Sequence, residues 1–212
     1  MKILKTICIL LIVFLTYSCK TGYIPTGVNT PMLTQKNQVS GTADALLIGD
    51  LQAAYSITNH LLVLGDVSSS IATDNPTGAY SYSGGAGYFN TFSKKQILEV
   101  VVGGGQGVSD FEYNKFYLQT TYAKSDENFE FGFTARGVMA NYPSVKLQNG
   151  NTISTNDFFI EPVGTFRVGA PNIKFHMQLG LSLPLVYTSE TVFIPFIMNI
   201  GLNVKFPGSS SE

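Results

Sequence analysis

Tryptophan is absent from this chain of 212 residues, cysteine occurs only twice, and charged residues make up 13%. A soluble domain usually carries about 25% charged residues, so the shortage indicates a surface that largely avoids water. Abundant aromatic residues, 11 Tyr and 15 Phe, argue against intrinsic disorder. The net charge of -1 and the lack of a basic patch exclude nucleic acid as a partner.

Long hydrophobic runs are missing apart from one near the start. That run, Ile7 to Leu15, follows the basic residues Lys2 and Lys5. It is shorter than the roughly 20 residues of a membrane-spanning helix. A short apolar run behind a basic start is typical of an export signal. We therefore predict a signal peptide over residues 1–18.

Cys19 follows the predicted signal, in the sequence Thr16-Tyr17-Ser18-Cys19. This sequence resembles the lipobox of bacterial lipoproteins, in which the signal is cut before a Cys that is then acylated; that family usually has Leu where Thr16 stands. Cys8 would leave with the signal, so the mature chain keeps one Cys and forms no internal disulfide. The resemblance implies a lipid anchor such as palmitate on Cys19. The alternative is an ordinary signal peptide cut near Ser18.

Apolar residues fall on every second position in three segments between residues 156 and 206. In the second segment, residues 173–185, the odd positions are Ile, Phe, Met or Leu, while the even positions include Lys174, His176 and Gln178. A period of two is the signature of a strand. These strands are long, and their second face carries charged side chains. The pattern therefore predicts a barrel with an apolar outside and a polar inside.

The connections between the segments alternate in length. Tight ones are expected at residues 58–60, 93–95, 125–128 and 169–172, and looser ones around Asp74, Asp110, Asn149 and Glu190, with residues 142–155 the longest. Short turns at one end and longer loops at the other are typical of outer-membrane barrels. We predict an all-β, antiparallel up-and-down barrel of about 8–10 strands. Ten is preferred, because an even count puts both termini at the short-turn end, beside a lipid in the inner leaflet.

Aromatic residues gather near the expected strand ends, and amphipathic rings prefer the headgroup level of a membrane. Several strands also run near or beyond the roughly 9–11 residues that cross a bilayer at a slant. The aromatic residues predict two girdles, formed by Tyr80, Tyr82, Tyr88, Phe89, Phe92, Phe111, Tyr113, Tyr142, Phe158, Tyr187 and Phe193.

The remaining parts of the chain have less regular sequences. Residues 19–36 contain Pro and Gly without periodicity and are predicted to form an extended tether. The barrel domain follows over residues 37–206, and residues 207–212 form a C-terminal tail. Phe206 resembles the C-terminal aromatic residue of outer-membrane barrels. The glycines of residues 103–107 lack the Lys-Ser/Thr of a phosphate-binding loop, and we interpret them as a bend or bulge in a strand.

Short motifs are spread over the mature chain. They are Cys19 with Tyr23-Ile24-Pro25 and Asn29-Thr30-Pro31, residues 51–60 (LQAAYSITNH), Phe129-Glu130-Phe131, and Glu161-Pro162 with Thr165-Phe166-Arg167. Together they resemble a family of lipoproteins of Bacteroidetes-type bacteria that carry a small outer-membrane-like barrel. The resemblance implies a fold and a location rather than an activity. The location is the outer membrane of a Gram-negative bacterium, with an N-terminal lipid anchor.

Charged residues on the second face of the strands are the candidate functional residues, and they comprise Glu99, Glu130, Arg136, Glu161, Arg167, Lys174, His176 and Lys205. They predict either a polar pore or binding cavity, or a salt-bridge network that fills the barrel. The network is preferred, because side chains just fill a barrel of about eight strands. The two histidines, His60 in a turn and His176 among polar residues, predict no catalytic triad and no metal site. No cofactor is predicted.

The main hypothesis is a non-enzymatic outer-membrane barrel lipoprotein with a structural or surface-recognition role. Its expected partners are outer-membrane lipids and a protein at the cell surface or in the periplasm. The alternative is a lipid-tethered, soluble lipocalin-like or sandwich domain, whose apolar face points inward around a hydrophobic ligand. A weaker alternative is a small pore, which the bulky inward residues Tyr117, Arg136 and Phe159 oppose. The face that meets water separates the first two hypotheses.

Overall fold

The computed structural model describes residues 21–45, 48–70, 78–93, 95–146, 152–186, 192–193 and 196–208. These residues form strands, the turns between them and an extended segment over residues 24–34. No helix in this part of the chain is long and apolar enough to cross a membrane. The predicted signal peptide, Cys19 and most of the predicted C-terminal tail lie outside the described residues.

Strands are the regular elements of the described part of the chain, as the period of two predicts. The strands are β1 (Thr21–Tyr23), β2 (Val39–Ala45), β3 (Ile48–Ser56), β4 (Leu61–Ser70), β5 (Ala79–Ser93), β6 (Gln96–Val108), β7 (Glu112–Ser125), β8 (Phe129–Lys146), β9 (Thr152–Gly169), β10 (Ile173–Leu181), β11 (Leu183–Val186), β12 (Val192–Phe193) and β13 (Phe196–Phe206). The three alternating segments of the C-terminal part correspond to β9, to β10 with β11, and to β13.

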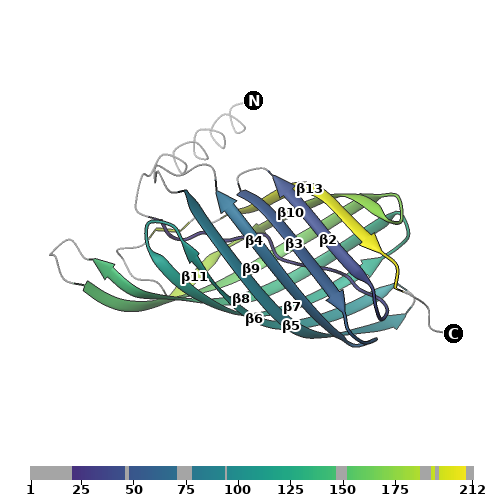
Figure 1. Cartoon of the computed structure of the whole chain (residues 1–212), viewed down its shortest axis with the longest axis horizontal. Helices are drawn as coiled ribbons and strands as arrows, with labels where there is room; N and C mark the ends of the chain where they lie inside the picture. The colour runs from purple at the N-terminus through teal and green to yellow at the C-terminus, as the bar shows by residue number, and fades with distance from the viewer. Residues whose placement is uncertain are drawn as a thin grey trace, which may run out of the picture.

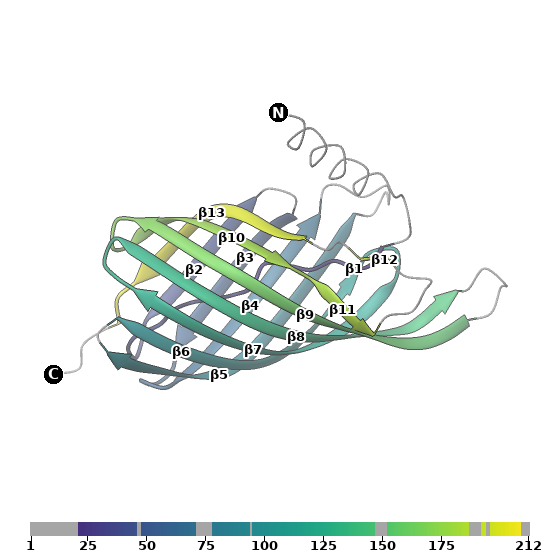
Figure 2. The ribbon, with the colours of Figure 1, turned by 180° about the vertical axis from the view of Figure 1, so that it is seen from behind.

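Eleven of these strands form one antiparallel sheet that closes on itself. Its order is β10-β13-β2-β3-β4-β5-β6-β7-β8-β9-β11, and β9 also pairs with β10, which completes the ring. Because β11 continues β10 beyond Ser182, ten strand positions surround the barrel. Figures 1 and 2 show the ring from two sides. The prediction of an antiparallel barrel, with ten strands as the preferred count, is confirmed.

The two faces of the barrel wall differ in polarity. Large apolar side chains on every strand of the ring point outward; Leu179, for example, is 51% exposed. The charged side chains at alternating positions point inward, and Glu161 and Arg167 are fully buried. The predicted assignment of faces is confirmed. The soluble alternative, in which the apolar face points inward, is wrong because the apolar side chains lie outside the ring.

At one end of the barrel, the turn end, short connections such as residues 57–60, 126–128 and 170–172 join consecutive strands. The looser connection predicted around Asp110 at the other end is wrong, because only residues 109–111 separate β6 from β7. The opposite end is the loop end. The loop predicted over residues 142–155 is wrong for most of its length, because β8 runs to residue 146 and β9 begins at residue 152. Val145 pairs with Ile153, and both Tyr142 and Val145 are buried. The strands therefore continue into a hairpin that projects beyond the ring (Figure 1).

The aromatic residues predicted for the girdles divide between the two faces of the wall. Tyr80, Tyr82, Tyr88, Phe92 and Phe158 are exposed on the outside. Phe89, Tyr113 and Tyr142 are buried inside the barrel, so the girdle prediction is wrong for them. Phe111 is half-buried, and Tyr187 and the side chain of Phe193 lie outside the described part.

Glycines of β6 leave room for inward tyrosines rather than bend the strand. A Cβ atom at Gly103 would collide with the ring of Tyr117, and one at Gly107 with the ring of Tyr113. The pairing of β6 with β7 runs without a register shift through all of these positions. The predicted bend or bulge is therefore wrong, and the glycines are needed for close approach.

Residues 22–34, predicted to be part of a tether, lie inside the barrel. At the loop end β1 pairs in parallel with β12. At the turn end Asn37, with φ of 60°, reverses the chain into β2, and its N–H donates to the Ser56 carbonyl at 2.9 Å; Asn adopts this left-handed conformation more readily than most residues. The chain therefore enters at the loop end, crosses the lumen and leaves at the turn end. The ring itself begins and ends at the turn end, as predicted, because Val39 pairs with Phe206, but the chain ahead of β2 reaches the loop end.

Candidate functional site: the filled lumen

The luminal segment, which we define as residues 22–34, is an extended chain that the barrel encloses. Every residue from 22 to 33 is buried, although residues 24–34 belong to no strand. A buried backbone without a sheet ladder must find other partners for its N–H and C=O groups. Pro25 and Pro31 lack an N–H, which reduces the number of donors to be satisfied. The remaining groups turn to the polar side chains of the barrel wall.

At the loop end, a hydrogen bond and an aromatic cluster hold the start of the segment. The Ser109 hydroxyl donates to the Gly22 carbonyl at 2.6 Å. The Tyr23 ring stacks on Phe159, with centroids 4.8 Å apart, and meets the edge of Tyr113 at 5.6 Å. These inward aromatic residues form part of the largest apolar cluster of the described barrel. They close the lumen above the polar middle.

In the middle of the barrel, Arg136 and Gln178 bind the backbone of the segment. The Arg136 guanidinium donates to the carbonyls of Thr26 at 2.8 Å and Gly27 at 3.4 Å. The Gln178 amide accepts from the Val28 N–H at 3.0 Å and donates to the Val28 carbonyl at 2.6 Å. The amide of Gln178 thus replaces the neighbouring strand that Val28 lacks.

Asn29 and Gly27 fit the segment to the opposite wall. The Asn29 amide donates to the carbonyl oxygens of Ala53 at 3.1 Å and Gly65 at 3.2 Å, while the Gln119 amide donates to the Asn29 carbonyl at 2.8 Å. A Cβ atom at Gly27 would overlap polar side chains of the wall, those of Asp50, Gln52 and Asn199. Without a side chain at residue 27, the segment can pass this point while these three wall side chains keep their positions.

Towards the turn end, charged side chains hold the lower part of the segment. The Arg167 guanidinium donates to the Thr30 carbonyl at 2.7 Å, and the Lys205 ammonium to the Met32 carbonyl at 3.0 Å. The Leu33 N–H donates to the Glu99 carboxylate at 3.2 Å. Apart from the Asn29 and Thr30 side chains, these bonds reach main-chain atoms. The barrel therefore recognises the segment chiefly through its backbone.

Glu130 connects three of these basic residues. Its carboxylate lies 3.2 Å from Arg167 Nη1, 3.0 Å from Lys174 Nζ and 2.6 Å from Lys205 Nζ, and it is 1% exposed. A buried charge requires this kind of pairing, because its desolvation is otherwise too costly. Glu130 thus neutralises and orients the side chains that bind Thr30 and Met32.

The predicted interior residues are all buried, none more than 7% exposed, but they form separate groups. Glu130, Arg167, Lys174 and Lys205 meet at the turn end. Arg136 pairs with Glu161 at 2.6 Å, farther up the lumen, and Ser182 donates to the other Glu161 oxygen at 3.0 Å. His176 pairs with Asp44 at 2.8 Å. Glu99 accepts its hydrogen bond from the Leu33 N–H of the segment rather than from a basic side chain.

Several residues of this site were not predicted. They are Asp44, Asp66, Lys115 and Gln119, together with the luminal segment itself, whereas Gln178 was expected on the polar inner face. The four wall residues have the inward phase of a strand, which is the signal that would have identified them. Lys115 and Asp66 form a buried pair at 3.7 Å on the side of the lumen away from Glu130. No signal of this kind marks the segment, because its backbone rather than its side chains is bound.

The chemistry of the lumen is that of binding a chain. Among the described residues, no group of three or more His, Cys, Asp and Glu side chains could hold a metal ion. His60 lies in the turn after β3 and stacks on Tyr88 at 5.5 Å, away from His176.

At the turn end, Lys95 donates a hydrogen bond to Asp126. This hydrogen bond lowers the pKa of Asp126 and raises the pKa of Lys95. That pair is exposed to solvent, so it contributes little to stability.

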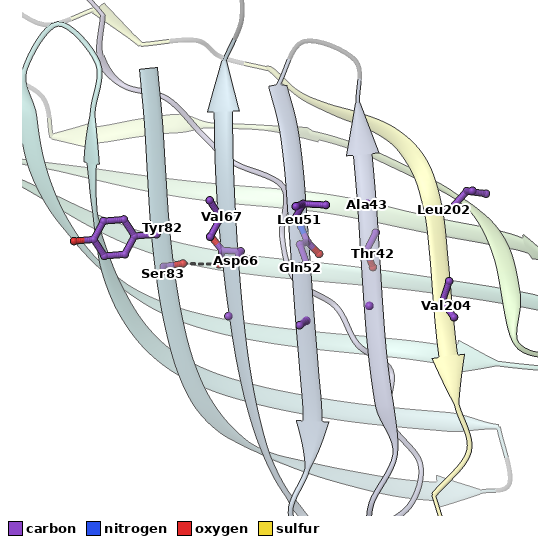
Figure 3. A pocket seen from close by; sticks show the side chains of 13 residues that line it. Thr42, Ala43, Leu51, Gln52, Asp66, Val67, Tyr82, Ser83, Leu202 and Val204 are labelled. Carbon is purple, nitrogen blue, oxygen red and sulfur yellow. Dashed lines mark hydrogen bonds between the residues drawn. The ribbon is translucent and has the colours of Figure 1, made fainter. Parts of the chain in front are cut away.

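A groove of about 780 Å³ lies on the outside of the barrel, over β13, β2, β3, β4 and β5. Its floor consists of small residues such as Ala43 and Gly65, and apolar side chains such as Leu51, Val67 and Leu202 surround it (Figure 3). The Ser83 hydroxyl donates to Asp66 on the luminal side of the same strands. The groove therefore belongs to the apolar outer face and is separate from the filled lumen.

Replacing Glu130 with Gln should destabilise the barrel strongly. Arg167, Lys174 and Lys205 would keep their buried positive charges without the carboxylate, and breaking a buried pair in this way costs about 3–5 kcal/mol. The free energy of unfolding can be measured by urea titration in detergent. The matched control is Glu127→Gln in the exposed turn, for which we expect a change within about 0.5 kcal/mol. Equal effects of the two substitutions would contradict the assigned role of Glu130.

A disulfide can test the position of the luminal segment directly. The hydroxyls of Thr30 and Thr165 lie 3.3 Å apart, so Thr30→Cys with Thr165→Cys should form an intramolecular disulfide during export to an oxidising compartment. Thr30→Cys with Thr120→Cys is the control, since Thr120 points outward from β7. Non-reducing electrophoresis of a digest separates the products. Equal cross-linking of both pairs, or of neither, would place the segment elsewhere.

Solved structures include barrels that resemble this chain. The chain is similar to the N-terminal β-barrel domain of Pseudomonas aeruginosa OprF, with a TM-score of 0.42 and 8% sequence identity, over 81% of this chain and 99% of that chain. No protein-family model matches the chain, and no curated protein matches it. The assignment of a closed barrel depends on the strand pairings themselves, which form a complete ring.

Proposed function

We propose that this protein is a non-enzymatic outer-membrane β-barrel lipoprotein of the Bacteroidetes type. Its own N-terminal segment fills the lumen of the barrel. The barrel acts as a structural anchor, and its loop end presents a recognition surface to a protein at the cell surface. The lipids of the outer membrane are its other partner. A lipid on Cys19 adds a second attachment.

The observation that carries this proposal is the apolar outer face. Exposed Leu, Val, Ile, Met, Phe and Tyr side chains occur on every strand of the ring, while the charged side chains at the inward positions of the strands are buried. A monomeric soluble protein rarely exposes contiguous apolar patches larger than a few hundred Å². Transmembrane barrels have this apolar outside and polar inside, since the strands satisfy each other's backbone groups within the bilayer. The outer groove would then face acyl chains.

The filled lumen supports an anchor rather than a pore. The luminal segment is buried over residues 22–33, and the bulky side chains of Tyr117, Arg136 and Phe159 are at most 8% exposed. An aqueous channel would leave polar inner residues in contact with water. Instead, the charged side chains of the lumen are bonded to the segment and to one another.

Within the described part of the loop end, the projecting β8–β9 hairpin offers a surface for recognition. Its outer residues include Pro143, Ser144 and Ser154, which are exposed, while Tyr142 and Val145 are buried on its inner side. Packing on one side keeps the hairpin rigid, and the polar residues on the other side remain available. Binding residues often occur on loops that a rigid scaffold positions in this way.

Electrophoretic mobility tests the proposed barrel. Unheated protein from the membrane fraction should migrate differently from boiled protein, because a folded transmembrane barrel resists the detergent until heated, and it should resist alkaline extraction. Leu179→Arg should weaken this folded form, since Arg near the bilayer midplane costs about 2–4 kcal/mol. Ser144→Arg on the hairpin is the control and should behave as wild type. Release of wild-type protein by alkali, or an unaffected Leu179→Arg variant, would contradict the membrane assignment.

Fatty-acid labelling tests the proposed lipid anchor. Wild-type protein should incorporate radiolabelled palmitate, and Cys19→Ala should abolish the incorporation. Cys8→Ala is the matched control and should label normally, because Cys8 lies within the predicted signal peptide. Labelling that persists in Cys19→Ala would exclude Cys19 as the lipid acceptor.

A further inference from the structure

We propose that the two ends of the mature chain lie on opposite sides of the membrane, with the N-terminal end and any lipid on Cys19 on the side of the loops. This inference rests on the proposed function, since it requires that the barrel spans a bilayer. It goes beyond that function by assigning the anchor to one leaflet, the outer one.

The number of crossings gives the first argument. Ten strand positions run between the two ends of the barrel, so the start of β2 and the end of β13 lie at the same end. Phe206 accordingly pairs with Val39. The luminal segment adds one more crossing before β2. The number of passages from one end of the barrel to the other is then odd. The chain ahead of the segment must therefore begin at the end opposite to Phe206.

Contacts along the segment give its direction independently. Gly22 is bonded to Ser109, in the connection between β6 and β7 at the loop end. At the other extreme, the Lys36 N–H donates to the Asn59 side chain at 2.9 Å, in the turn between β3 and β4. The bonds of Thr26, Val28, Thr30 and Met32 follow in that order between these points. The whole segment is therefore one continuous passage from the loop end to the turn end.

The length of the segment agrees with a membrane crossing. The eleven residues from 24 to 34 can span about 36 Å when extended, and the hydrocarbon core of a bilayer is about 30 Å thick. Two residues separate Thr21 from residue 19, so the covalent chain can carry residue 19 no farther than about 7 Å from the β1–β12 pair at the loop end. A lipid on Cys19 can then reach only the leaflet next to the loops.

The backbone contacts also make the passage difficult to reverse. Residues from β3, β6, β7, β8, β9, β10 and β13 bind the segment, and the closed ring surrounds it on all sides. A chain held in this way cannot leave sideways without breaking strand pairs. Withdrawal along the barrel axis would break the hydrogen bonds to the wall, so these contacts favour the N-terminal end at the loop end.

Cysteine accessibility in intact cells tests the inference. Four single substitutions are compared: Lys20→Cys beside the segment, Ser210→Cys in the tail, Ser144→Cys on the loop-end hairpin and Glu127→Cys in a turn. Each is treated with a membrane-impermeant maleimide before and after the outer membrane is permeabilised. The unmodified protein shows any reaction of Cys19 itself, and denatured samples give the full extent of labelling.

We expect Lys20→Cys to react in intact cells together with Ser144→Cys, at several times the level of the unmodified protein. Ser210→Cys and Glu127→Cys should react only after permeabilisation. If Lys20→Cys instead follows Glu127→Cys, the inference is wrong while the barrel itself stands. If all four positions react alike, in intact cells or only after permeabilisation, the two ends of the barrel do not lie on opposite sides of the membrane, and the proposed function fails together with the inference. Release of all four variants from the membrane by alkali would mark a failure of the proposed function itself.

Discussion

The requirement that buried backbone groups find hydrogen-bond partners governs this structure. An extended chain in the middle of a barrel has no neighbouring strand, so its carbonyl and N–H groups must be bound by side chains. Arg136, Gln178, Arg167 and Lys205 reach inward from the wall to do so. Without the segment these side chains would face an empty polar lumen, and without them the segment would be buried with unpaired backbone groups.

The same requirement explains why the charges are inside and why the wall is apolar outside. The ring satisfies its own strands by closure, which leaves the outer side chains free to be apolar. The few charges of the chain are concentrated where they bind the segment and one another, around Glu130 and Glu161. A chain with 13% charged residues can therefore be well paired internally although its outer surface carries little charge.

The barrel and its inward charges could be predicted from the sequence, because both depend on a period of two that each strand displays locally. The strand alternation around Glu161 and Leu179 was sufficient for the face assignment. The luminal segment could not be predicted. Its Pro, Gly and Thr residues resemble those of a linker, and the contacts that place Thr26 or Thr30 come from β8 and β9, more than 100 residues later. Gly103 was misinterpreted because the tyrosine that needs its space belongs to the next strand.

Hydrogen exchange of the luminal segment tests this account most directly. The Val28 N–H is bonded to Gln178 and the Leu33 N–H to Glu99, and both residues are fully buried. In the folded barrel in detergent, a peptide covering residues 24–34 should exchange as slowly as the strands of the ring. Exchange at the rate of an unfolded chain, in a barrel whose strands remain protected, would show that the segment lies outside the lumen and would contradict the account.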